Sequence, residues 1–212
     1  FNPDKGINYS LGRCHINSCD FSLENYTYVA DNDDNLETFN ISREHKWVIP
    51  VIKAASKERG EKIKILASPW SPPAWMKSNN CMNHGGKLLT KYYETWARYI
   101  CKYIKEMKSA GINIKAVTIQ NEPQAVQVWD SCIYSGEEER DFVKLLGPIL
   151  VDEGLSDIKI LIWDHNRDLI IDRAKAVLED KEAFKYVWGI AFHWYVSEDF
   201  RNVGKVHELY PT

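Results

Sequence analysis

Several features that would assign the chain to a specialised class are missing from its sequence. No stretch of the 212 residues is apolar over a length that could span a bilayer. Neither sign of charge dominates, because 27 Lys and Arg against 30 Asp and Glu leave a net charge of −3. Nucleic-acid-binding proteins usually carry a basic face, so we expect no nucleic-acid partner. The hydrophobic fraction of 44% is ordinary for a globular protein, and the length suffices for one substantial core.

Paired-cysteine motifs and nucleotide-binding motifs are also missing. The five cysteines are odd in number and none has Cys-x-x-Cys spacing, so we expect neither a zinc site nor a complete disulfide framework. We expect mainly reduced thiols, and a single disulfide stays open. Neither Gly-x-Gly-x-x-Gly nor a Walker loop occurs, which removes the main support for a nucleotide-binding doubly wound sheet. The acidic run at 31–35 lacks the glycine and closing glutamate of a calcium loop, because Leu36 and Ser42 occupy those positions.

The chain instead alternates short apolar segments with amphipathic ones. The segments with strand character are 6–16, 62–68, 116–119, 158–163 and 187–192. The segments with helical spacing are 41–59, 90–110, 135–154, 170–178 and 203–209. We expect Thr90 to cap the second of these helices, and Ser135 to Glu138 to form a capping box for the third. This alternation predicts parallel strands joined by right-handed helical crossovers.

Polar or aromatic side chains follow every predicted strand. They are Arg13, Trp70, Asn121 and Glu122, Asp164 and His165, and His193 and Tyr195. Five strand ends that meet on one face are typical of a (β/α) barrel, in which catalytic groups lie at the carboxyl ends of the strands. A doubly wound sheet would scatter the outer ends. The order of segments therefore predicts an α/β fold of the barrel type.

The stretch from Ala116 to Pro123 carries the strongest single signal. Its β-branched residues predict a buried strand, and Pro123 must end that strand because proline cannot donate to a ladder. Asn121 and Glu122 then lie at a strand end, where they could act in catalysis. The alternative is an ordinary strand end with a solvated glutamate. Arg13 leaves a similar choice between a paired charge and a surface arginine with a packed stem.

Aromatic residues are abundant, with 8 Trp and 11 Tyr. Trp70 and Trp75 lie in the segment 69–75, which contains three prolines and so must be a rigid loop. Flat aromatic rings at a strand end suit a platform for sugar rings. A hydrophobic plug over the core is the alternative.

Taken together, these strand ends resemble glycoside hydrolase family 30, in particular its glucosylceramidase-like branch. The segments that carry the resemblance are SCDFS at 18–22, LASPWSPPAW at 66–75, TWARY at 95–99, AVT with NEP between 116 and 123, and HWY at 193–195. They occur in the family's order and cover nearly the whole chain. The loop from Trp129 to Tyr134 looks more like the bacterial members than the animal ones.

The resemblance implies a (β/α)8 barrel with an attached β-domain. Residues 1–212 would form part of the catalytic barrel, about strands two to six, without the β-domain. Glu122 corresponds to the general acid/base, and Asn121 to the residue that binds the sugar 2-hydroxyl. Family sugar-binding positions match Arg13, Asp20, Trp70, His193 and Tyr195. The family's nucleophile is a second glutamate, which we expect beyond Thr212, with Arg13 as a candidate to keep it ionised.

The resemblance also implies a reaction. We expect a retaining β-glycosidase that acts on glucosyl linkages of a β-glucoside or glycolipid by double displacement, with no cofactor and no metal. The alternatives are β-xylosidase, β-fucosidase or endo-β-1,6-glucanase activity, or a non-catalytic carbohydrate-binding fragment. Oligomeric state stays open. So does location, secreted or cytoplasmic in a bacterium, because the chain begins without an initiator Met or signal peptide.

Overall fold

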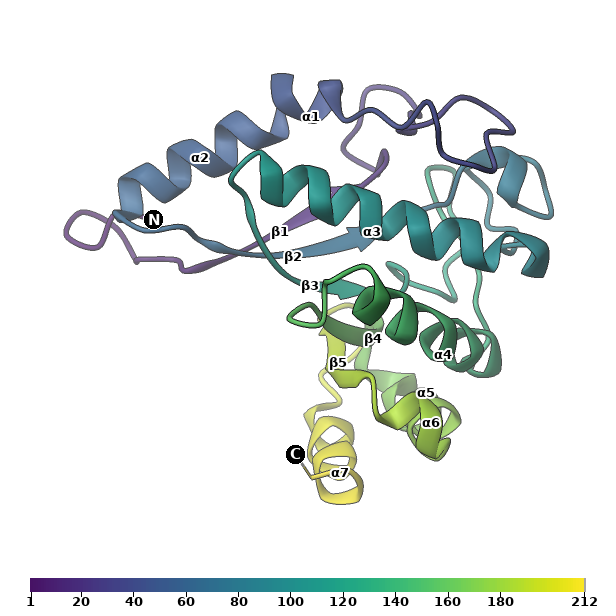
Figure 1. Cartoon of the computed structure of the whole chain (residues 1–212). Coiled ribbons are helices and arrows are strands. Elements are labelled where there is room, and N and C mark those ends of the chain that lie inside the picture. Colours follow the sequence, from purple (N-terminus) through teal and green to yellow (C-terminus); the bar gives the residue numbers. More distant parts are fainter. Residues whose placement is uncertain (212) are drawn as a thin grey trace.

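A computed structural model describes residues 1–211 and shows one curved parallel sheet with helices along it (Figure 1). Within these residues the sheet has five strands, in the order β1-β2-β3-β4-β5. They are β1 Leu11–Ile16, β2 Lys64–Pro69, β3 Asn113–Thr118, β4 Lys159–Asn166 and β5 Val187–His193. Every neighbouring pair is parallel. Strands that neighbour each other in chain order are those of a barrel, so the predicted fold class is confirmed as a partial (β/α) barrel.

Helices connect the strands and lie against one another around the sheet (Figure 1). The helices in the described part of the chain are α1 Ser42–Lys46, α2 Val48–Arg59, α3 Tyr93–Ser109, α4 Gly136–Asp152, α5 Ile170–Leu178, α6 Lys181–Phe184 and α7 Phe200–Leu209. Short 3-10 turns occur at Ala74–Met76, Thr90–Tyr92 and Arg167–Leu169. Helices that follow one another along the chain pack together: α3 packs against α4, and α4 packs against α5. These helices pack along the sheet and do not cover the carboxyl ends of the strands, where a site can form.

The core lies between the sheet and these helices. Val117 and Ile162 on the strands are fully buried, as are Trp96, Ile100 and Ile104 on α3. Each such side chain contributes roughly 1.5–3 kcal/mol through burial of its apolar surface. The apolar stripe that the sequence predicts on α3 is therefore a packed core face.

Some predicted boundaries are wrong. The first strand begins at Leu11 instead of residue 6, and Ile7 and Tyr9 are exposed. The predicted helix 41–59 is divided at Trp47 into α1 and α2. Pro50 lies in the first turn of α2, where its missing N–H costs no helical hydrogen bond.

Two of the predicted helix starts are wrong and one is confirmed. Thr90 does not cap α3, because it begins a 3-10 turn and the helix starts at Tyr93. The capping box of α4 is confirmed, since the Ser135 side chain accepts from the Glu138 N–H and the Glu138 side chain accepts in return. The last predicted helix, 203–209, begins three residues earlier at Phe200.

The cysteines and the apolar content give two further observations. All five cysteines are free, so the open question of a disulfide is answered in the described chain. Among residues 1–211, no helix combines the length and the apolar character needed to cross a membrane.

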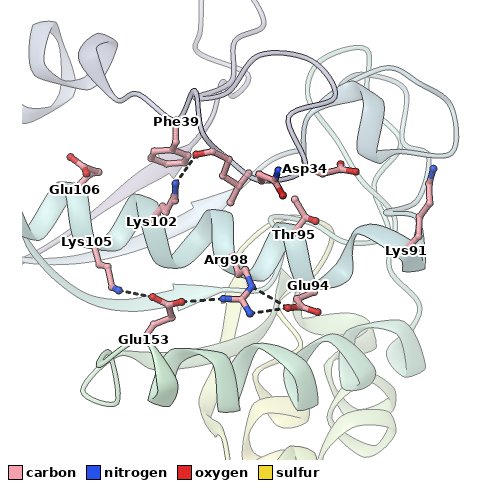
Figure 2. Close-up of a pocket in the computed structure, with 12 residues that line it drawn as sticks. Asp34, Phe39, Lys91, Glu94, Thr95, Arg98, Lys102, Lys105, Glu106 and Glu153 are labelled. Atoms are coloured by element: carbon pink, nitrogen blue, oxygen red, sulfur yellow. Dashed lines mark hydrogen bonds and ion pairs between the residues drawn. The ribbon is translucent and has the colours of Figure 1, made fainter.

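A hollow of about 690 Å³ lies on the outer face of α3, away from the strand ends (Figure 2). Its charged side chains largely pair with one another: Arg98 donates to Glu94 and Glu153, and Lys105 donates to Glu153. Lys102 Nζ donates to the carbonyl of Leu36 at 2.6 Å. These contacts hold the long polar loop and α4 against α3. We therefore interpret the charged side chains of this hollow as structural contacts between elements.

Candidate active site

A cavity of about 470 Å³ lies at the carboxyl ends of the strands. The seven residues to which the family resemblance gives a catalytic or sugar-binding role all line this cavity, although they come from distant parts of the chain. They are Arg13, Asp20, Trp70, Asn121, Glu122, His193 and Tyr195. The fold thus brings the predicted residues together, while the individual roles assigned to them stay predictions.

The backbone around Glu122 explains why this carboxylate lies at the cavity. The ladder continues past the end of β3, because the Asn121 N–H donates to Pro69 O at 2.8 Å and the Glu122 N–H donates to Asp164 O at 3.0 Å. Glu122 then adopts a left-handed conformation with φ of 46°. For a residue with a side chain this conformation costs about 1–2 kcal/mol. Pro123 follows at once. β3 itself ends at Thr118, so the predicted strand end at Pro123 is wrong, although single backbone hydrogen bonds to the neighbouring strands continue up to Glu122.

Asp164 is the central acceptor of the site. It is only 2% exposed and lies in an irregularity of β4, where the register shifts between Trp163 and His165. Its Oδ2 accepts from Arg13 Nη2 at 2.6 Å and from Thr118 Oγ1 at 2.8 Å. Its Oδ1 lies 3.0 Å from His193 Nε2. Burial alone would raise the pKa of Asp164, but hydrogen bonding to His193 and the charge of Arg13 lower it below the ordinary value.

Arg13 is a paired charge, not an isolated surface arginine. Besides the ion pair with Asp164, its Nη2 donates to Asn121 Oδ1 at 2.9 Å and its Nε donates to Ser68 Oγ at 3.0 Å. The guanidinium also lies 4.7 Å from the centre of the Trp70 ring. Arg13 therefore fixes the amide of Asn121 and one wall of the cavity at the same time.

His193 bridges the two carboxylates of the site. Its Nδ1 lies 2.9 Å from Glu122 Oε1, and its Nε2 faces Asp164. Burial by itself would lower the pKa of His193, but the hydrogen bonds to Asp164 and Glu122 outweigh burial and raise it to about 9. At neutral pH the imidazolium therefore donates to both acids. The same hydrogen bond lowers the pKa of Glu122.

This direction differs from the raised pKa that a general acid needs. In a retaining pair the anionic nucleophile beside the acid raises its pKa, whereas in the described chain His193 lies beside Glu122. The nearby Asp20 shows the opposite behaviour, since burial and the charge of Glu122 raise its pKa. Glu122 is thus an ionised acceptor in the chain described here.

The aromatic residues divide into walls and plugs. Trp70 is 8% exposed and Arg13 covers one face of its ring, so it is a wall of the cavity and not an open platform. Trp75 packs edge-on against Tyr92 with ring centres 5.0 Å apart, as the plug alternative predicts. Tyr195 is half exposed at the rim and stacks on Trp194.

Sequence reasoning missed several residues that line or support the cavity. Gln127 and Trp129 come from the loop after Glu122, and Asn166 ends β4. The sequence places Asp164 and His165 at a strand end but assigns neither of them a role, although they end a buried strand like the other site residues. The loop after Pro123 offered no comparable pattern.

Three of these groups could also face a cation. Glu122, His165 and His193 each place one ligand atom within 4.8 Å of the others. Both ring nitrogens of His193 already contact carboxylates, so a metal would have to displace the proton shared with Glu122. The arrangement fits acid–base chemistry on an organic substrate at least as well as metal binding.

These features define a class of protein: a (β/α)-barrel chain with carboxylates, amide and aromatic groups at the carboxyl ends of its strands. A family model makes the assignment specific, because the Glycosyl hydrolase family 30 TIM-barrel domain matches residues 1–212. The chain belongs to this family, and the predicted resemblance is confirmed.

Relatives and solved structures agree with the family. The lysosomal acid glucosylceramidase of Mus musculus is 38% identical over 223 residues, which cover 98% of this chain and 43% of the mouse protein. The crystal structure of SrfJ from Salmonella typhimurium is 43% identical, with a TM-score of 0.91 over 96% of this chain and 46% of its own. The endo-beta1,6-glucanase BT3312 is 33% identical, with a TM-score of 0.92 over the whole chain and 48% of its own. The chain thus spans less than half the length of the proteins it matches.

Proposed function

We propose that the full-length protein containing this chain is a retaining β-glycosidase that hydrolyses β-glucosyl linkages. The observation that carries the proposal is Glu122, which lies at the carboxyl end of β3 with Asn121 beside it and His193 against its carboxylate. A barrel strand end is where this fold keeps its catalytic groups. The similarity to a glucosylceramidase supports a glucosyl substrate, either a glucoside or a glycolipid.

Glu122 acts as the general acid/base in the proposed reaction. A second carboxylate attacks the anomeric carbon while Glu122 protonates the leaving oxygen, and water then hydrolyses the glycosyl-enzyme with Glu122 as base. The two carboxyl groups of such a pair lie about 5–5.5 Å apart. A carboxylate at that distance would raise the pKa of Glu122 and offset the lowering by His193.

The second carboxylate is supplied by a part of the full-length barrel outside this chain. Asp164 also contacts His193, but it is buried and its oxygens face Arg13, Thr118 and His193. A carboxylate held in this way has no oxygen free to attack a sugar. The barrel type to which the chain belongs has eight strands, so further strand ends are available to carry the nucleophile.

The remaining site residues bind and orient the sugar. We assign the 2-hydroxyl to Asn121, whose side-chain oxygen is held by Arg13, and further hydroxyls to Asp20 and His193. Trp70 and Tyr195 shape the apolar walls. An endo-β-1,6-glucanase activity is a second candidate, because the similarity to BT3312 extends over the whole chain.

The test is a leaving-group comparison in the full-length protein. Glu122→Gln should abolish hydrolysis of an alkyl β-glucoside, which needs a proton on its leaving oxygen. Formation of the glycosyl-enzyme from a dinitrophenyl β-glucoside should be largely spared, because that leaving group departs without acid assistance. Undiminished turnover of the alkyl glucoside by this variant would overturn the assignment. A panel with β-1,6-glucan separates the two candidate substrates.

A further inference from the structure

A buried ion pair lies directly behind the site and has no part in the chemistry proposed above. Glu139, on the first turn of α4, is fully buried, and Arg173 of α5 is 3% exposed. Glu139 Oε2 accepts from Arg173 Nη1 at 2.9 Å. Arg173 Nη2 donates to the carbonyl of Tyr134 at 3.0 Å, so both ends of the guanidinium are held. Burying two charges is costly, so a pair of this kind indicates a specific structural or functional role.

The second carboxylate oxygen of Glu139 contacts the backbone of β4. Glu139 Oε1 accepts from the backbone N–H of Trp163 at 2.8 Å. That N–H lies next to the point where β4 leaves its regular register with β5. The carboxylate takes the place of a strand partner for this N–H. Arg173 also lies 4.8 Å from the centre of the Trp163 ring, so the pair holds this residue by both backbone and side chain.

The conformation held in this way is unusual. Trp163 and Asp164 are consecutive non-glycine residues with φ of 73° and 50°. Two left-handed residues in a row within a strand persist only where surrounding contacts impose them. Here the contact from α4 satisfies the N–H that the turn removes from the ladder.

The turn sets the direction of Asp164. Its side chain contacts His193, and its carbonyl accepts from the Glu122 N–H. A contact chain therefore runs from α4 through β4 to the carboxylate of the proposed acid/base.

We propose that Glu139 and Arg173 are positioning residues that hold Asp164 in its working orientation. This role rests on the proposed function, since its effect on catalysis passes through Glu122. Loss of the pair should rotate the turn and let Asp164 move away from His193. The acid/base would then lose its fixed geometry although no residue that contacts the substrate has changed.

Two double variants of the full-length protein isolate the critical hydrogen bond. Arg173→Met with Glu139→Leu removes both charges together, so that neither is left buried and unpaired. Arg173→Met with Glu139→Gln differs only in keeping a side-chain oxygen for the Trp163 N–H. Leu150→Ala is the control for general destabilisation, because Leu150 is buried near the other end of the same helix.

The readout is the ratio of kcat/KM for an alkyl β-glucoside to that for a dinitrophenyl β-glucoside. This ratio does not depend on the fraction of folded enzyme, so a merely structural role leaves it unchanged. We expect the Leu double variant to lower the ratio by about tenfold or more, and the Gln double variant to stay near wild type. Equal ratios in the two variants, or an equal drop in Leu150→Ala, would overturn the role.

A second measurement separates this role from the proposed function. If wild type cleaves neither glucoside, the proposed function fails, and NMR titration of His193 still tests the positioning. The pKa of His193 should fall from about 9 toward about 6.5 in the Leu double variant. If that variant does not fold, Arg173→Met with Glu139→Met replaces it, because it likewise leaves the Trp163 N–H without a side-chain acceptor, and the same fall is expected. An unchanged His193 pKa in the folded variant tested refutes the positioning role.

Discussion

At the scale of single residues, the site is organised around the imidazolium of His193. One of its two N–H groups faces Glu122 and the other faces Asp164, while Arg13 pairs with Asp164 through the other carboxylate oxygen. Each partner favours the charged form of its neighbour, which is why the pKa of the imidazole rises and those of both acids fall. An acid/base must exchange protons in every turnover, so its neighbours set when the proton is available.

This arrangement makes stability depend on pH. The folded pKa of His193, about 9, exceeds its ordinary value of about 6.5, so the folded state binds the proton more tightly. The stabilisation is fully present below pH 6.5 and is lost as the pH rises through 9. After a discount for partial exposure we expect its size to be about 1–2 kcal/mol.

Urea unfolding of the full-length protein and its His193→Gln variant measures this effect. The difference in unfolding free energy between the two should be larger at pH 6 than at pH 10, because only wild type carries the His193 proton, which is lost between these pH values. Comparing the two proteins cancels the other titrating groups. A difference that is the same at both pH values would contradict the ion pairing described for His193.

At the scale of elements, α4 carries more than its place in the sequence suggests. Its N-terminus is closed by the capping box at Ser135, and the same first turn carries Glu139, which contacts β4. Further along, the helix runs through Pro148 without interruption. Gly147 lets it pack against Tyr186, since a Cβ there would lie 2.2 Å from the tyrosine ring.

Gly147→Ala should therefore destabilise the protein. The added methyl group has no room, and overpacking of this kind costs about 1–3 kcal/mol. Gly204→Ala on α7 is the matched control, because a Cβ there meets no atom within 4 Å and alanine favours a helix by about 1 kcal/mol. Thermal melting should show opposite shifts for the two variants, and equal shifts would contradict the packing of α4.

At the scale of the whole molecule, the sheet has two open edges in the described part of the chain. β1 pairs only with β2, and β5 only with β4. Leu11, Trp188 and Phe192 on these edge strands are 61%, 59% and 43% exposed. Unpaired strands with exposed apolar side chains associate readily with other chains.

We expect residues 1–212 alone to associate and to be inactive. Light scattering should detect species larger than a monomer, and no glucoside should be hydrolysed, because the proposed nucleophile lies outside these residues. The full-length protein is the positive control for activity. A monomer that melts cooperatively, or measurable turnover by residues 1–212, would contradict this view of the chain as part of a barrel.

Much of this organisation could be predicted because it is local or periodic. Strand and helix identity followed from apolar spacing, and the capping box from Ser135 to Glu138 marked the start of α4. Boundaries failed where tertiary contacts decide, as at Thr90, where a 3-10 turn precedes the helix. The role of Trp75 as a plug also depends on its neighbour Tyr92, which no local pattern reveals.

Spacing and residue type along the chain were enough to predict the order of strands and helices, the family, and seven of the residues that line the cavity. What those residues touch depends on the tertiary structure. Asp164 became the central acceptor because a left-handed turn in β4 aims it at Arg13 and His193. The pKa of Glu122 is lowered for a similar reason, because folding brings His193, 71 residues further along the chain, into hydrogen-bond contact with it.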